Sequence, residues 1–154
     1  METSESSVSS WVEVLNSTVC LRCWRAGLLA SRGDTDIISS IYRAYIVLPE
    51  VFGVNAWVRS VVDRLAAQGH PALGGPLFAR TAPELELAYD RTDLVEGRRH
   101  KDATTAKQIL GDVAAAVSCL GARCPHATIH VVGFCFWRPH CLGLSSPLIF
   151  MAPA

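Results

Sequence analysis

The order of apolar and polar positions along the chain predicts strands that alternate with helices. The run Tyr42–Pro49 has the length and the branched and aromatic side chains of a buried strand. A helix should follow, because Asn55 can cap it, Gly69 can end it, and apolar residues recur between them at helical spacing: Val58, Val61, Val62 and Leu65. The segment His70–Phe78 stands where the next strand is expected, although its prolines and glycines weaken that prediction.

The second half of the chain repeats this alternation after a charged stretch. Residues 79–102 show no apolar period and predict a long surface loop. Thr105 and Gln108 form a capping box for a second helix, whose apolar stripe is Ile109, Val113, Val117 and Leu120. Ala127–Phe134 is the second clear strand. This order predicts the α/β class, with a mostly parallel sheet flanked by helices and with sites at the carboxyl ends of its strands.

The first 41 residues are harder to interpret. Residues 1–18 are serine-rich and are expected to fray at their start, Val19–Ala26 is a candidate edge strand, and Gly33 with Asp34 predicts a turn. The opening METSESS lacks the basic start of a secretory signal, and no apolar run approaches the ~18 residues of a membrane-spanning helix. We therefore expect one cytoplasmic domain that is not in a membrane.

Charge and cysteine content narrow the possible partners. The formal net charge is zero and the basic residues are scattered, so nothing favours binding to nucleic acid or to an anionic membrane. Cys20 and Cys23 form a C-x-x-C pair, but zinc would need a second ligand pair, and Cys119 with Cys124 has a poorer spacing. We favour two ordinary thiols on a strand and expect no metal or cofactor. A thiol or zinc protein is the alternative, and it predicts stoichiometric zinc in purified material.

Two residues at predicted strand ends could carry chemistry, Glu50 and Cys135. The stretch HVVGFCFWRPH resembles the strand-to-turn pattern Gly-x-nucleophile-x-Gly, in which Gly133 supplies the first glycine and Trp137 replaces the second. Two interpretations of Cys135 remain open at this point: a nucleophile, or a small hydrophobic residue ending a buried strand. Glu50 is in the same way either a functional carboxylate or a solvated one.

The segments LPEVFGVNAWVRSVVDRLAAQGH, LFARTAPELELAYD, EGR, DVAAAV and VVGFCF, in this order within residues 42–136, resemble the dienelactone hydrolase family. That family has an α/β-hydrolase fold and a cysteine nucleophile. The resemblance implies that Cys135 attacks a lactone or ester carbonyl and that Glu50 helps to activate the thiol. It also implies that the backbone N–H groups of Val51 and Phe136 form the oxyanion hole. Arg98 and Arg99 are candidates for binding the small-molecule substrate, and the alternative for them is a solvated basic turn.

The resemblance stops after Phe136. In the family, the Asp and His of the triad come well after the elbow, but residues 137–154 contain no Asp or Glu. His140 follows Cys135 too closely to match the family histidine, and Pro139 would interrupt the elbow helix. We therefore expect an incomplete α/β-hydrolase fold that lacks the C-terminal strands, with impaired lactone or ester hydrolysis. The alternative is a truncated pseudoenzyme that acts only as an interaction fragment.

The abrupt change at Trp137 suggests a shift of reading frame. Without its leading T, the single tryptophan codon followed by an arginine codon reads as glycine, which would restore the second glycine of the elbow. The nucleotide sequence tests this hypothesis, because the shifted frame should encode the missing acidic and histidine loops and the further strands.

Overall fold

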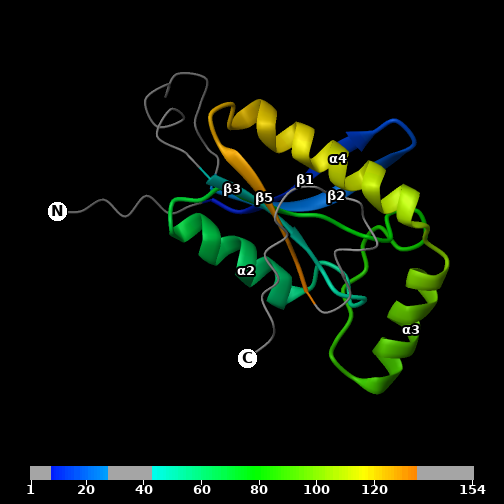
Figure 1. Ribbon diagram of the computed structural model, residues 1–154. Coiled ribbons are helices and arrows are strands. Elements are labelled where there is room, and N and C mark those ends of the chain that lie inside the picture. The colour runs from blue at the N-terminus through cyan, green and yellow to red at the C-terminus, as the bar shows by residue number, and fades with distance from the viewer. Residues whose placement is uncertain (1–7, 28–42, 135–154) are drawn as a thin grey trace.

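The computed structural model describes residues 8–27 and 43–134, which form a five-stranded sheet in the order β1-β2-β4-β3-β5. The strands are β1 Ser10–Asn16, β2 Val19–Ala26, β3 Arg43–Leu48, β4 Ala72–Gly74 and β5 Thr128–Gly133. The helices are α2 Ala56–Ala67, α3 Arg91–Asp102 and α4 Ala106–Arg123. Figure 1 shows α2 on one face of the sheet, α4 on the other, and α3 apart from both. Within the two described ranges, no helix combines the length and the hydrophobicity needed to cross a bilayer.

The sheet has a parallel part and an antiparallel part. β3 lies between β4 and β5 and runs parallel to both, whereas β2 runs antiparallel to β1 and to β4. The α/β class and both clear strands, β3 and β5, are as predicted. The weak strand also forms, but the prolines on either side of it limit β4 to three residues.

Both predicted helices are confirmed, together with the residues that begin them. The Asn55 side chain accepts a hydrogen bond from the Val58 N–H at 3.2 Å and thereby caps α2. At the start of α4, the Gln108 N–H donates to the Thr105 hydroxyl at 3.3 Å, and the Thr105 N–H donates to the Gln108 side chain at 2.8 Å. These reciprocal bonds satisfy backbone donors that the first turn of a helix leaves free.

The prediction for the N-terminal region was incomplete in one respect and wrong in another. Residues 10–16 form the edge strand β1, for which no element was predicted. Val19–Ala26 is an inner strand, because it pairs with β1 on one side and with β4 on the other. The predicted turn at Gly33 and Asp34 lies outside the described residues.

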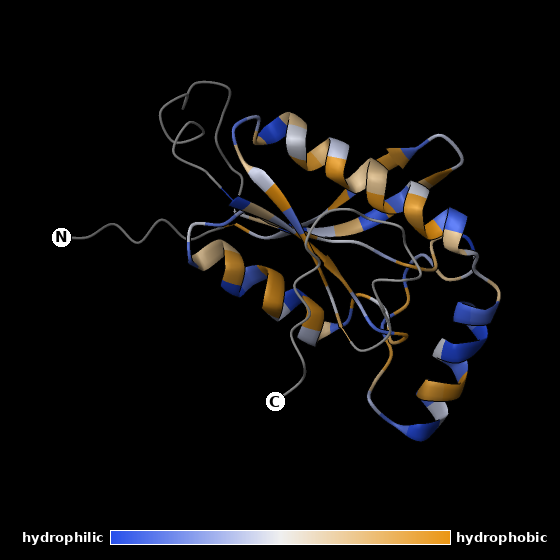
Figure 2. Cartoon of the chain, viewed as in Figure 1, coloured by the Kyte–Doolittle hydropathy of each residue, from blue (hydrophilic) through white to orange (hydrophobic). Residues whose placement is uncertain are grey.

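The predicted loop over residues 79–102 was also wrong, because its second half is helix α3. Asp90 caps this helix by accepting a hydrogen bond from the Asp93 N–H at 2.9 Å. Only Gly97 and His100 of α3 are buried. Figure 2 shows α3 as mostly hydrophilic, in contrast to the apolar stripes of α2 and α4. A helix without an apolar stripe leaves no periodic signal in the sequence.

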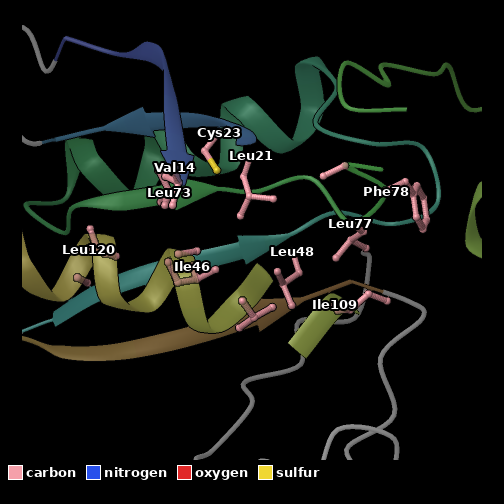
Figure 3. Close-up of a cluster of buried hydrophobic side chains, with 14 of the residues drawn as sticks. Val14, Leu21, Cys23, Ile46, Leu48, Leu73, Leu77, Phe78, Ile109 and Leu120 are labelled. Atoms are coloured by element: carbon pink, nitrogen blue, oxygen red, sulfur yellow. The ribbon is translucent and has the colours of Figure 1, made fainter. Parts of the chain in front are cut away.

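The sheet separates two hydrophobic cores. On the α4 side, Ile46, Leu48 and Leu73 of the sheet pack with Ile109 and Leu120 of the helix (Figure 3). On the α2 side, the second core contains Ala26, Val47, Val54, Val58, Val62, Ala66, Ala72, Val132 and Phe134. Because β3 packs against a hydrophobic core on each face, the position of its carboxyl end is fixed. The position of the residues that follow β3 is therefore also restricted.

Candidate active site

The two strands that precede the residues predicted to carry chemistry lie side by side. β3 and β5 are paired in parallel register, with Leu48 opposite Gly133, so Glu50 follows one strand end and Cys135 follows its neighbour. Phe134 is buried and makes an edge-to-face contact with Trp57 of α2, with ring centres 4.6 Å apart. Cys135 itself lies outside the described residues. So do Phe136, Trp137, Pro139 and His140.

The loop after β3 requires a glycine at position 53. Gly53 has a φ of +77°, and a Cβ atom there would lie 1.9 Å from the carbonyl oxygen of Leu85. The same close approach lets Gly53 form an isolated antiparallel bridge with Glu86, while the Leu87 N–H donates to the Phe52 carbonyl at 2.9 Å. The glycine of the Glu-Val-Phe-Gly segment therefore allows a second chain segment to support the loop.

Helix α3 supports the same loop from another direction. A Cβ atom on Gly97 would lie 2.3 Å from the Val51 carbonyl oxygen, so only a glycine lets α3 approach this closely. Among the described residues, no hydrogen-bond acceptor takes the Val51 N–H. The loop therefore presents a backbone donor beside the strand end where the resemblance places an oxyanion hole, and its backbone is held on two sides.

Tyr89 lies near Glu50 and was missed in the sequence. Its ring packs against Phe52, with centres 4.6 Å apart. Partial burial raises the pKa of the Tyr89 phenol; a hydrogen bond from Asn55 opposes this shift, and the nearby Glu50 charge adds to it. The Asn55 amide also donates to the Leu87 carbonyl at 3.1 Å. Asn55 was predicted only as a helix cap, since nothing in the sequence indicated its contacts across the loop.

An open cleft lies between α3 and the β1–β2 hairpin, and Leu85, which approaches Gly53, is one of its lining residues. Glu96, Arg99 and His100 line it from α3, and Thr81, Cys20 and Arg22 are among the residues on its other walls. His100 is buried and lies 2.9 Å from Glu96 through Nε2 and 3.0 Å from Thr81 through Nδ1. These residues were missed because the helix was missed, although an acid and a histidine four residues apart are a detectable pair on any helix.

The two candidate arginines have different positions. Arg99 lines the cleft and forms an ion pair with Glu96 at 2.6 Å, and this hydrogen bond is the main cause that lowers the pKa of Glu96. Arg98 is exposed and is not among the residues lining the cleft. Of these two arginines, Arg99 alone lines the cleft.

The cysteines of the C-x-x-C pair are free thiols on strand β2, as predicted. Cys20 is exposed and Cys23 is buried, because residues three apart on a strand point to opposite faces. Burial is the first cause that raises the pKa of Cys23 to about 12. Within residues 8–27 and 43–134, no group of three or more histidine, cysteine or acidic side chains is arranged to hold a metal.

Comparison with known proteins agrees with this architecture. The model of the dienelactone hydrolase family matches residues 37–137, which is more than half of the chain, and the chain belongs to that family. A Synechocystis protein named as a carboxymethylenebutenolidase is 34% identical over 113 residues, which are 70% of this chain and 45% of that protein. The chain thus spans about half the length of the curated relative that it matches.

Solved structures share the fold at low sequence identity. A Klebsiella pneumoniae protein named as a dienelactone hydrolase has a TM-score of 0.64 and 19% identity, over 84% of this chain and 50% of that chain. The dienelactone hydrolase from Anabaena variabilis has a TM-score of 0.55 and 14% identity, over 84% of this chain and 52% of that chain. The described residues therefore form part of an α/β-hydrolase fold, which confirms the predicted incomplete fold.

Proposed function

We propose that this chain performs the acylation step of a dienelactone-hydrolase-type reaction, with Cys135 as nucleophile and a small lactone or ester as substrate. One observation carries the proposal. The strand ends that precede Glu50 and Cys135 are neighbours in register, and the Val51 N–H, three residues after the end of β3, has no acceptor among the described residues. Membership of the family supports the reaction class. We propose that residues 42–136 form the domain that carries this activity. We also propose that the protein acts in the cytoplasm and binds no nucleic acid.

The proposed step transfers an acyl group to sulfur. Glu50 accepts the thiol proton, and the Cys135 thiolate attacks the carbonyl carbon, which forms a C–S bond and an oxyanion. The N–H groups of Val51 and Phe136 stabilise the oxyanion by donating hydrogen bonds to it. When the C=O bond re-forms, the C–O bond of the ester breaks, and the leaving alkoxide takes the proton from Glu50. The product is a thioester, which water later cleaves to a carboxylic acid and the free thiol.

Hydrolysis of this thioester is proposed to be slow. Residues 137–154 contain no Asp or Glu, and His140 is the only histidine that follows Cys135. A positioned general base typically contributes ~10²–10⁴-fold to such a step. We therefore expect the acyl-enzyme to accumulate.

Arg99 is proposed to bind the substrate. It lines the cleft between α3 and the β1–β2 hairpin and is a permanent cation, so it would attract a carboxylate or another anionic group of the substrate. Arg98 is a matched control on the same helix, because it is exposed outside the cleft. We expect Arg99→Met to raise the half-saturating concentration of an anionic ester roughly tenfold, as loss of a charged hydrogen bond does, and Arg98→Met to leave it unchanged.

The acylation experiment uses the full chain, p-nitrophenyl acetate and intact-protein and peptide mass spectrometry. One acetyl group should add selectively to Cys135, and Cys135→Ala should abolish it. Glu50→Gln should slow acetylation without abolishing it. Absent labelling, or equal labelling of all six cysteines, would contradict the proposal.

A non-catalytic interaction fragment is the second candidate. Strand β5 is at the end of the described sheet and has a neighbour on one side only, and an unpaired strand edge can pair with another chain. Size-exclusion chromatography distinguishes the two candidates. A monodisperse monomer that is acetylated at Cys135 supports the enzyme, and a defined complex without acetylation supports the fragment.

A further inference from the structure

The N-terminal hairpin β1–β2 lies before the region that matches the family model, which begins at residue 37. We propose that this hairpin positions the loop after β3 in the candidate active site, residues 50–55, which we call the Val51 loop. It would act through an ion-pair chain that runs from Arg22 to Glu86 to Arg59. The oxyanion part of this inference rests on the proposed function, whereas the positioning part does not.

Glu86 is the central residue of the chain. Its carboxylate accepts a hydrogen bond from Arg59 at 2.5 Å and lies 3.9 Å from Arg22. Its backbone forms the bridge with Gly53, two residues beyond Val51. Anything that fixes the Glu86 side chain therefore also fixes the backbone that pairs with the loop. The two arginine side chains are partly shielded, with exposed fractions of 32% for Arg22 and 23% for Arg59, whereas Glu86 is exposed, with a fraction of 36%.

Arg59 also forms a hydrogen bond with the Val51 loop itself. The same Nη1 atom that contacts Glu86 donates to the Val54 carbonyl at 2.9 Å. Arg59 thus joins helix α2, the end of the loop and the segment that bridges the loop. Because one guanidinium group contacts all three elements, a movement of the Glu86 side chain should also displace the Val54 backbone.

The hairpin presents Arg22 on a rigid aromatic platform. The Arg22 guanidinium lies 3.7 Å from the ring centre of Trp11, which contacts Trp24 with ring centres 5.2 Å apart. A cation over an aromatic face is attracted by the ring and loses mobility. Trp24 in turn donates to Asp63 of α2 at 2.9 Å. The hairpin is therefore fixed to α2, and Arg22 reaches Glu86 from a defined position.

The test compares two reactions of Cys135 in the full chain. Acetylation by p-nitrophenyl acetate develops an oxyanion, whereas alkylation by iodoacetamide displaces iodide and needs no oxyanion hole. Glu86→Gln should lower the maximal acetylation rate about tenfold, less than the ~10²–10³-fold that follows loss of an oxyanion donor. The half-saturating ester concentration and the alkylation rate should stay unchanged. Arg59→Met and Arg22→Met should act in the same direction, and Arg59→Lys should restore part of the rate.

A matched control should leave both reactions unchanged. Arg64→Met removes an exposed cation from the same helix as Arg59. Equal slowing of acetylation and alkylation by Glu86→Gln would overturn the inference, because it would indicate general damage to the site or the thiol.

Hydrogen exchange provides a readout that needs no activity. Glu86→Gln should speed exchange of the backbone amides in residues 50–55 several-fold, while amides of α4 keep their protection. Unchanged exchange in residues 50–55 would overturn the positioning role. If the wild-type chain is not acetylated but exchange responds as expected, the proposed reaction fails and the positioning role of the hairpin stands.

Discussion

At the scale of single residues, two glycines decide how the candidate site is built. The backbone of Leu85 packs directly against Gly53, and the carbonyl of Val51 packs directly against Gly97. A Cβ atom on either glycine would clash with these backbone atoms. Neither glycine carries chemistry. Both belong to the segments that resemble the family, so part of that resemblance reflects the space that the loop backbone needs rather than the reaction.

Gly97→Ala should therefore destabilise the fold. Its Cβ would lie 2.3 Å from the Val51 carbonyl oxygen, and forcing extra volume into a packed contact costs about 1–3 kcal/mol. Gly111→Ala is the matched control, because it lies within a helix and its Cβ would be 3.6 Å from Asn16, an ordinary contact. That control should be neutral or stabilising. Urea unfolding compares the two variants, and equal effects would contradict the close approach.

Cys23 should make stability depend on alkaline pH. Its pKa is raised from 9.0 to about 12, first by burial and then by the neighbouring cysteines 119 and 20. A folded pKa above the unfolded one means that the thiol contributes its full stability below pH 9.0 and loses it as the pH rises towards about 12. In this range the free energy of unfolding of Cys23→Ala should fall less steeply than that of the wild type. Parallel slopes would contradict this prediction.

At the scale of elements, the apolar stripe decided which helices could be predicted. Helix α4 has both a buried stripe and a reciprocal capping box, and it was found with its first residue. Helix α3 has a cap at Asp90 but buries only Gly97 and His100, and it was taken for a loop. Its position depends on contacts with the Val51 loop and Thr81, which no local pattern encodes.

The capping box of α4 should contribute measurably to stability. Thr105→Ala removes the side chain that accepts from the Gln108 N–H, and loss of such a cap costs about 1 kcal/mol. Thr92→Ala provides a control, since Thr92 is exposed in the first turn of α3 and is not its cap. Chemical denaturation of both variants measures the difference. A Thr92 effect as large as that of Thr105 would contradict the assignment of the cap.

At the scale of the whole molecule, a partly buried ion pair joins parts that are distant in sequence. Asp112 of α4 accepts two hydrogen bonds from Arg80, at 2.7 and 3.1 Å, and one from Asn16 at 2.6 Å. Its side chain is 4% exposed. Arg80 also donates to Thr18 in the β1–β2 turn at 3.1 Å. This cluster connects the hairpin, the segment after β4 and the helix.

Breaking this pair should be more harmful than replacing it. Asp112→Ala leaves the Arg80 guanidinium, whose side chain is 24% exposed, without its carboxylate, and an unmade hydrogen bond to a charged group costs roughly 1–3 kcal/mol. The double variant Arg80→Met with Asp112→Leu should lose less stability than the sum of the two single changes, because the residues are coupled. A double-mutant cycle by urea unfolding measures this coupling, and strict additivity would contradict it.

The sequence by itself determined the parts that rest on local periodicity and capping. These are strands β3 and β5, helices α2 and α4 with their caps, the α/β class, and the candidate position Glu50 after a buried strand. Each depends on residues close together in the chain, so a single pass along the sequence can detect it.

Only the tertiary structure decided how those parts meet. It placed β2 inside the sheet and β1 at the edge of the sheet. It also folded a polar segment into helix α3, and it brought Glu86, Arg59 and Gly97 to the Val51 loop. It also separated Arg99, which lines the cleft, from Arg98, which does not. The physical reason is that strand order, close approaches and ion pairs join residues tens of positions apart, and a polar residue gives no sign in the sequence of the partner it will find.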